Sequence, residues 1–120
     1  MINKLFDLSG RVALITGGNG GIGLGMAEGL ASQGCEFAIW GTNPDKNAAA
    51  LKTLQQYGPK VSALKCDVAD QQVVEDYCKE SLKHYGRIDG CFENAGIGAR
   101  KETFDEMEKS EWDRVMAVNL

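Results

Sequence analysis

The sequence predicts an α/β fold with a doubly wound parallel sheet, and three observations carry this prediction. Short apolar runs alternate with longer segments of helical periodicity along the whole chain. The apolar runs are continuous rather than alternating, as in Phe37-Ala38-Ile39-Trp40, which is typical of parallel strands covered on both faces. A glycine-rich segment at 16–23 joins the first apolar run to the first helical one. Right-handed crossovers place helices on both faces of such a sheet.

About four strands and four flanking helices are expected, in strict alternation. The apolar runs predict strands over residues 11–16, 36–41, 60–66 and 88–93. The helical patterns predict helices over residues 22–33, 45–57, 70–85 and 110–120. No internal repeat or linker interrupts this order.

Several helix ends carry recognisable signals. Asn43 followed by Pro44 predicts a cap and a first helical residue for the second helix. Gly86 is expected to end the third helix. Ser110 and Asp113 resemble a capping box at the start of the last helix, with Asp in place of the usual Glu or Gln.

The last helix presents an apolar face made by Trp112, Val115 and Met116. These three side chains are expected to pack either in the core or in a helical interface between subunits. No glycine or proline terminates this helix before Leu120, so the 120 residues are interpreted as part of a longer protein.

Composition fits one small globular domain and excludes several classes of partner. The chain is 43% hydrophobic and 25% charged, which is ordinary for a globular protein. Its net charge of −4 and its scattered Lys and Arg residues predict no nucleic-acid partner. The apolar runs are too short to span a bilayer, so no membrane partner is expected. Residues 1–7 lack the pattern of a secretory signal, and a cytoplasmic location is therefore expected.

The four cysteines, Cys35, Cys66, Cys78 and Cys91, form no Cys-x-x-Cys pair. No metal site is predicted from them. Without a secretory signal they are expected to be free thiols, buried or half-buried as small apolar residues.

The glycine-rich segment predicts a site for a phosphate-bearing ligand. Read literally, Gly18, Gly20 and Gly23 match G-x-G-x-x-G, and the bland alternative is a tight turn that binds nothing. The segment follows a buried strand, begins a helix and precedes a second strand, which favours a Rossmann-type dinucleotide-binding unit. Glycines allow the backbone to approach the ligand, and the first N–H groups of the helix point at its anion.

One part of the dinucleotide fingerprint is missing. An acidic residue usually ends the second strand and binds the ribose hydroxyls, but Gly41 stands at that position. Thr42 and Asn43 follow it, and no arginine is present there to pair with a 2′-phosphate.

Taken together, four motifs in order resemble the short-chain dehydrogenase/reductase family. Thr16-Gly17-x-x-x-Gly21-Ile22-Gly23 resembles its cofactor loop, which makes Gly17, Gly21 and Gly23 the key glycines. Cys66-Asp67-Val68 resembles its Asp-Val step, and Glu93-Asn94-Ala95-Gly96 its Asn-Asn-Ala-Gly motif. Trp112…Val118-Asn119 resembles the helix that carries its catalytic asparagine.

The resemblance implies specific site residues. Asp67 is expected to accept from the adenine amino group, and Asn119 is the one expected catalytic residue in this chain. The implied cofactor-binding residues are Gly17, Asn19, Gly20, Gly21, Ile22, Gly23, Gly41, Thr42, Asn43, Asp67, Val68, Asn94, Ala95 and Gly96.

Two departures from the family pattern affect the cofactor. Glu93 replaces the first Asn of its motif and is expected either to disturb local backbone hydrogen bonds or to point to solvent. Members that prefer NADP often carry a basic residue at the position of Gly20 or Thr42, and members that prefer NAD often carry an acid at that of Gly41. None of these is present, so the resemblance implies NAD or NADP. The absent acid removes repulsion against a 2′-phosphate, which favours NADP slightly.

The resemblance implies hydride transfer between the nicotinamide and a small alcohol or ketone. The family's proton-transferring Tyr-x-x-x-Lys pair is missing, because Val61, Ser81 and Asp89 follow the three tyrosines at that spacing. Residues 1–120 are therefore expected to be the partial NAD(P)-binding Rossmann domain of a longer enzyme, inactive alone and homo-oligomeric at full length. The segment 40–44 weakly resembles sugar-acid and 3-oxoacyl reductases.

Two other functions fit parts of the pattern. A non-catalytic dinucleotide-binding module would keep the glycine loop and lack the tyrosine. A methyltransferase also places glycines after its first strand, but it usually has an acid where this chain has Gly41.

Overall fold

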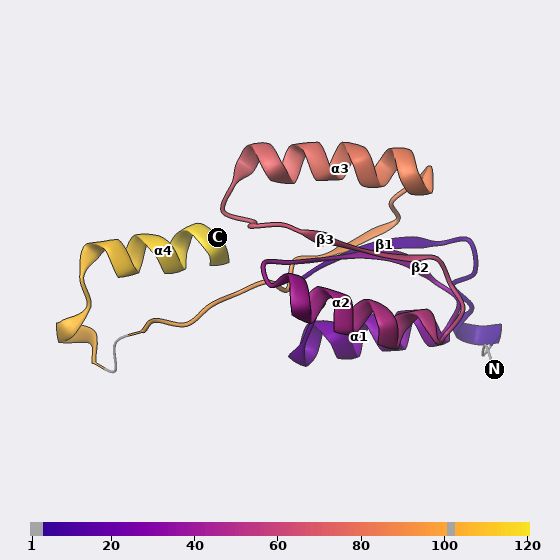
Figure 1. The fold of residues 1–120 in the computed structure, drawn as a ribbon, viewed down its shortest axis with the longest axis horizontal. Helices are drawn as coiled ribbons and strands as arrows, with labels where there is room; N and C mark the ends of the chain where they lie inside the picture. Colours follow the sequence, from indigo (N-terminus) through magenta and orange to yellow (C-terminus); the bar gives the residue numbers. More distant parts are fainter. Residues whose placement is uncertain (1–3, 101–102) are drawn as a thin grey trace.

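The computed structural model describes residues 4–100 and 103–120 and contains a parallel sheet with helices on both faces (Figure 1). The strand order is β3-β2-β1-β4. The strands are β1 (Val12–Thr16), β2 (Glu36–Gly41), β3 (Val61–Lys65) and β4 (Gly90–Phe92). This arrangement confirms the predicted doubly wound fold, with its sheet limited to these strands.

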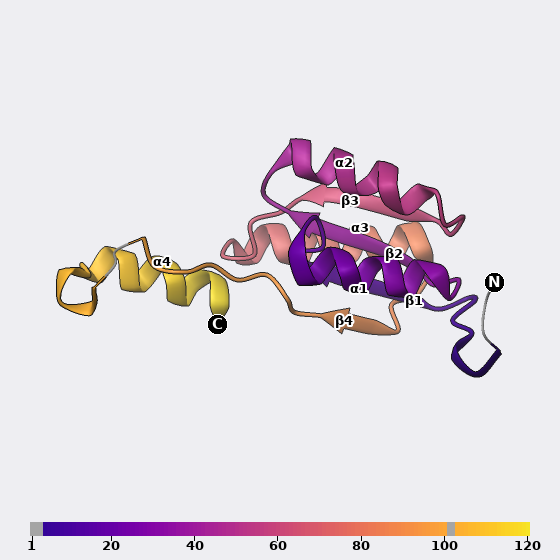
Figure 2. The same ribbon diagram turned by 90° about the horizontal axis from the view of Figure 1, so that it is seen from below.

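Helices α1 (Gly21–Ser32) and α2 (Pro44–Gln55) cover one face of the sheet, and α3 (Gln71–Tyr85) covers the other (Figures 1 and 2). Helix α4 (Lys109–Asn119) lies beyond the carboxyl ends of the strands rather than on a face. Short 3-10 turns occupy Lys4–Phe6 and Phe104–Glu106. No helix in the described ranges is both long and apolar enough to cross a membrane.

The core lies on both sides of β1 and β2 because successive strand residues point to opposite faces. Ile15, Phe37 and Ile39 pack under α1 and α2. Leu14 and Trp40 pack under α3. Residue 12 of β1 pairs with residue 36 of β2, and residue 16 pairs with residue 40. The double burial explains why these strands read as continuous apolar runs.

The predicted bounds of the elements agree with the observed ones to within about two residues, and the capping signals explain most of the agreement. Asn43 caps α2 through its Oδ1, which accepts from the N–H groups of Asp45 at 3.0 Å and Lys46 at 3.1 Å. Asp70 caps α3 by accepting from the N–H of Val73 at 3.2 Å. Gly86 ends α3 in the left-handed conformation, with φ at 81°.

The predicted capping box at Ser110 and Asp113 is wrong. Helix α4 begins at Lys109, and its N-cap residue, Glu108, makes no side-chain capping bond. The carboxylate of Asp113 instead accepts from the ammonium of Lys109 at 2.6 Å, one turn earlier on the same helix. This ion pair engages the Asp113 carboxylate that the capping box would have used.

One of the two alternatives for the apolar face of α4 is excluded, and the expectation for one cysteine is wrong. Trp112 is 51% exposed and α4 contains no buried residue, so the apolar face of this helix is not core. The alternative, an interface between subunits, stays a prediction. All four cysteines are free, as predicted, but Cys91 is exposed on β4 and not buried.

Candidate functional site

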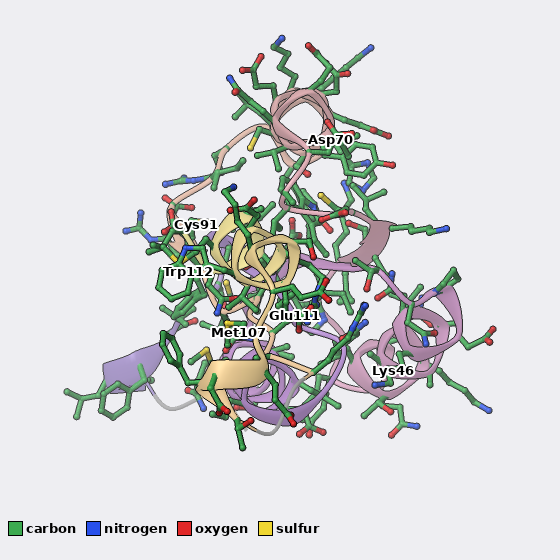
Figure 3. All side chains as sticks on the ribbon, turned by 90° about the vertical axis from the view of Figure 1, so that its left-hand side faces the viewer. Lys46, Asp70, Cys91, Met107, Glu111 and Trp112 are labelled. Atoms are coloured by element: carbon green, nitrogen blue, oxygen red, sulfur yellow. The ribbon has the colours of Figure 1, made fainter. Side chains whose placement is uncertain are left out.

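The loops that follow the strands meet around one hollow of about 400 Å³ at the carboxyl end of the sheet, the usual place for a ligand in an open α/β fold. Its lining combines the loops after all four strands with the first turn of α2 and one face of α4. The lining residues are Gly17, Asn19, Trp40, Thr42, Asn43, Lys46, Cys66, Asp67, Val68, Ala95, Gly96, Ile97, Arg114 and Val118. Figure 3 looks onto this end of the molecule.

The start of α1 differs from the starts of α2 and α3. Its N-cap, Gly20, has no side chain to bond the first N–H groups of the helix, whereas Asn43 and Asp70 bond those of the other two. The first N–H groups of a helix have no partner within the helix, and they carry its partial positive charge. The start of α1 is therefore suited to an anion such as a pyrophosphate.

Four glycines of the loop are constrained by geometry, since Gly21 also has a positive φ, of +52°, and a Cβ on Gly18 would lie 2.6 Å from Cγ2 of Ile39. Gly17 has a φ of +66°, which side-chain-bearing residues rarely adopt. A Cβ on Gly23 would collide with the carbonyl oxygen of Gly17 and would lie 2.5 Å from Nδ2 of Asn94. This close approach holds the start of α1 against the loop. All three glycines of the register Gly17, Gly21 and Gly23 are constrained, whereas Gly20 of the literal motif has an extended backbone and open space, which favours the former register.

Asn94 and Thr16 tie the first loop to the loop after β4. Nδ2 of Asn94 donates to the carbonyl oxygens of Thr16 at 3.1 Å and Gly17 at 3.3 Å. The hydroxyl of Thr16 accepts from the backbone N–H groups of Asn94 and Ala95, each at 3.0 Å. The Asn94 side chain is therefore committed to the backbone and acts as a positioning group. Glu93 is exposed, which agrees with the expectation that it points to solvent.

Asp67 and Val68 lie at the opposite wall of the hollow. Oδ1 of Asp67 accepts from the N–H of Ala69 at 3.0 Å. Oδ2 has no hydrogen-bond donor within residues 4–100 and 103–120, and the side chain is exposed. A carboxylate oxygen is thus available at this wall to accept from a ligand.

Asn119 adjoins a second hollow, of about 440 Å³, next to the first. Its Oδ1 accepts from the N–H of Ile97 at 2.9 Å, and its Nδ2 donates to the carbonyl of the same residue at 3.0 Å. Both ends of the amide are therefore bound to the backbone of one residue in the loop after β4. This pairing fixes where the end of α4 lies relative to the loop.

A second set of hydrogen bonds fixes the middle of α4. Arg114 donates to the carbonyl of Gly98 at 2.9 Å and to both carboxylate oxygens of Glu111, at 2.7 and 3.0 Å. The hydrogen bonds from Arg114, together with one from the backbone N–H of Arg100, hold the pKa of Glu111 at about 2. The carboxylate therefore stays charged at neutral pH and keeps α4 in place beside the hollow.

Sequence reasoning missed several residues of this site. Lys46 and Arg114 supply the positive charge that the lining contains, and Asn47 is a buried amide just behind it. Lys46 and Asn47 lie in the first turns of α2. The sequence signal that could have pointed to Asn47 is that its polar amide directly precedes three alanines. The described ranges hold no group of three or more His, Cys, Asp or Glu residues placed to bind a metal ion.

The chain is similar to known proteins in both sequence and structure. The family model described as short chain dehydrogenase matches residues 11–120. Gluconate 5-dehydrogenase of Gluconobacter oxydans (strain 621H) is 38% identical over 116 residues, which cover 97% of this chain and 45% of that protein. A 3-oxoacyl-[acyl-carrier-protein] reductase of Chlamydia pneumoniae is 33% identical over 113 residues, 94% of this chain and 45% of that protein.

Solved structures show the same relationship. A crystal structure of NAD+-bound xylitol dehydrogenase matches with a TM-score of 0.90 and 27% identity, covering 94% of this chain and 44% of that one. A metagenomic short-chain oxidoreductase in complex with NADP matches with a TM-score of 0.89 and 31% identity, covering 95% and 52%. The chain thus spans about half the length of the proteins it matches.

Proposed function

This chain belongs to the short-chain dehydrogenase family, and we propose that it forms the cofactor-binding half of an NAD(P)-dependent oxidoreductase. The observation that carries the proposal is the side-chain-free start of α1 beside the hollow. There the close approach of Gly17 and Gly23 leaves backbone N–H groups, and no side chain, to meet an anion. These residues fit a dinucleotide, whose pyrophosphate needs such a backbone cradle.

Each wall of the hollow has a proposed role toward the cofactor. The segment 19–23 binds the pyrophosphate through backbone N–H groups, and Gly17, whose own N–H donates to the carbonyl of Trp40 at 2.7 Å, lets the loop approach it closely. Gly41, Thr42 and Asn43 face the adenosine ribose, and Oδ2 of Asp67, with Val68, receives the adenine. Ala95 and Gly96 line the path toward the nicotinamide, with Asn94 holding their loop in place.

The bound dinucleotide supplies the hydride chemistry. This chain positions it and contributes Asn119, which we propose as the catalytic residue of this half. Asn119 keeps the loop after β4 in register with α4, at the border of the second hollow. The group that moves the proton lies outside the 120 residues, because no tyrosine here has a lysine four positions later.

We further propose a small polyhydroxy acid or a 3-oxoacyl compound as the substrate of the whole protein. The gluconate and 3-oxoacyl relatives support this choice. A non-catalytic dinucleotide-binding module is the second candidate, favoured by the missing Tyr-x-x-x-Lys pair. The homo-oligomer, with Trp112 in its interface, and the cytoplasmic location stay predictions.

Gly20 offers a test that separates binding from folding. No heavy atom lies within 4 Å of the position a Cβ would occupy, and its extended backbone is that of an ordinary N-cap residue. Gly20→Asp therefore leaves the free energy of unfolding within a few tenths of a kcal/mol or raises it. Its carboxylate repels the pyrophosphate, and we expect the Kd for NADPH to rise by about tenfold or more.

The measurement is a titration of the full-length protein with NADPH and NADH, followed by energy transfer from tryptophan to the nicotinamide. Trp40 lines the hollow, and Trp112→Phe removes the other tryptophan of residues 1–120. Gly20→Ser is the matched control, since it adds a capping oxygen without a charge and weakens binding less. Failure of the wild-type protein to bind either nucleotide saturably contradicts the proposed function. Turnover of sugar acids with the loaded protein then distinguishes the enzyme from the binding module.

A further inference from the structure

A buried amide network lies behind the hollow, at the end of β2. Nδ2 of Asn47 donates to the carbonyl oxygens of Gly41 at 2.9 Å and Leu64 at 3.3 Å, bridging the ends of β2 and β3. Its Oδ1 accepts from Nδ2 of Asn19 at 2.9 Å. Asn47 is only 6% exposed, so this side chain is held by protein groups rather than by water.

The two backbone carbonyls fix the orientation of both amides. Only the NH₂ group of Asn47 can donate to these two carbonyl oxygens, so its amide oxygen must face Asn19. That oxygen in turn requires the NH₂ end of Asn19. The second N–H of Asn19 finds no acceptor in the described part of the chain, and Asn19 lines the hollow. The network therefore presents an N–H of Asn19 at the end of β2, and neither of its two amide side chains is a carboxylate.

This network fills the space beside Gly41. A Cβ on Gly41 would collide with Nδ2 of Asn19 and would lie 2.5 Å from Oδ1 of Asn47. Any side chain at position 41 thus needs both amides to move. Because Asn47 is bonded to two strand ends, it cannot move without breaking those bonds.

We propose that Asn47 is a specificity-determining positioning residue: it holds the Asn19 amide over Gly41, which excludes a ribose-binding carboxylate and offers an N–H to a 2′-phosphate instead. This inference rests on the proposed function, since it concerns the same cofactor site. Thr42, which also lines the hollow, adds a hydroxyl, and Lys46, labelled in Figure 3, adds a cation. Donors and a cation suit a phosphate and leave a 2′-hydroxyl without a charged acceptor.

The geometric part of the inference can be tested without any cofactor. Gly41→Ala lowers the Tm of the unliganded full-length protein, because its methyl group collides with the two amides. Asn47→Ala lowers the Tm as well, but in that background Gly41→Ala costs clearly less, since Asn19 is then free to swing aside. Gly29→Ala, which meets nothing within 4 Å, is the control that adds independently to Asn47→Ala. Additive effects of Gly41→Ala and Asn47→Ala overturn the inference.

The cofactor part is tested by the ratio of the Kd values for NAD and NADP. The wild-type protein prefers NADP, and Asn47→Ala reduces that preference by about tenfold. Gly41→Asp alone binds both nucleotides poorly, whereas Gly41→Asp with Asn47→Ala binds NAD about tenfold more tightly than the single variant does. A complete switch to NAD by Gly41→Asp alone overturns the inference. If the Tm values show coupling but the wild type binds neither nucleotide, the proposed function fails, and the selectivity role fails with it.

Discussion

The contact between Gly23 and the carbonyl of Gly17 leaves no room for a side chain at position 23. Gly23→Ala places its methyl group against that carbonyl and against Nδ2 of Asn94. We expect this overpacking to lower the free energy of unfolding by about 1–3 kcal/mol. It also widens the gap between the loop and α1, so cofactor binding weakens. Chemical denaturation of the two proteins measures the first effect directly.

Gly29→Ala is the matched control for that experiment. Gly29 lies in the same helix, is exposed, and has no heavy atom within 4 Å of its would-be Cβ. Alanine is the better helix former, so this variant should be more stable than the wild type by about 0.5–1 kcal/mol. If both variants are stabilised alike, Gly23 does not approach Gly17 as the structure describes.

At the level of single residues, the sequence identified the glycines that the backbone conformation requires. It did not identify residues whose role depends on side-chain contacts with distant segments. Gly17 and Gly23 were identifiable because only glycine permits their conformation or contact. Asn47 was not, because asparagine is unremarkable near the start of a helix and its partners come from other segments of the chain. Lys46 carries no signal of its own in the sequence for the same reason. Its place at the hollow follows from how α2 returns to the carboxyl end of the sheet.

The elements themselves were predictable because local signals and burial agree. Continuous apolar runs predicted β1 and β2, which are buried on both faces, Asn43 marked the start of α2, and Gly86 marked the end of α3. Strand β4 is shorter than predicted, since its pairing with β1 covers only Gly90 to Phe92. The start of α4 was wrong because a nearby lysine takes the expected capping carboxylate. Which partner a carboxylate binds depends on the three-dimensional positions of the side chains, and the spacing of residues in the sequence does not determine it.

The beginnings of β1 and β4 are joined by one carboxylate, which gives the sheet a measurable dependence on pH. Asp89 accepts from the N–H of Val12 at 2.8 Å and from the guanidinium groups of Arg87 and Arg11. The hydrogen bond from Arg87 above all, then that from Val12, lowers the pKa of Asp89 to about 2. An unfolded aspartate titrates near pH 4, so the ionised folded form is the favoured one.

The sign of the effect follows from that difference. A carboxyl whose pKa is lowered by folding stabilises the protein above about pH 4, and this contribution is lost as the pH falls toward 2. Asp89→Asn is therefore expected to be less stable than the wild type at neutral pH and to approach it near pH 2. Urea denaturation at several pH values measures the difference. Asp113→Asn, on the exposed face of α4, is the control with a smaller effect. A stability difference for Asp89→Asn that is the same at both ends of this range would rule out the role given to its charge.

For the molecule as a whole, the open side of β4 governs how these 120 residues behave by themselves. Strand β4 pairs with β1 on one side, and its other side has no strand partner within the described ranges. Cys91 is exposed there, and Phe92 is 37% exposed. An exposed, apolar edge strand is a template for pairing with another chain. We therefore expect residues 1–120, expressed alone, to associate and to be poorly soluble.

Light scattering coupled to size exclusion, under reducing conditions, tests this expectation. Phe92→Lys places a charge on the edge and should shift the chain toward the monomer, because a lysine on an edge strand opposes pairing. Leu82→Lys is the matched control: it replaces another apolar side chain, 50% exposed but on α3, and should leave association unchanged. Equal gains from both variants would assign the association to general surface hydrophobicity. A monomeric, soluble wild-type chain would contradict the role of the edge itself, whereas a specific gain from Phe92→Lys identifies β4 as the side on which the sheet needs a further strand.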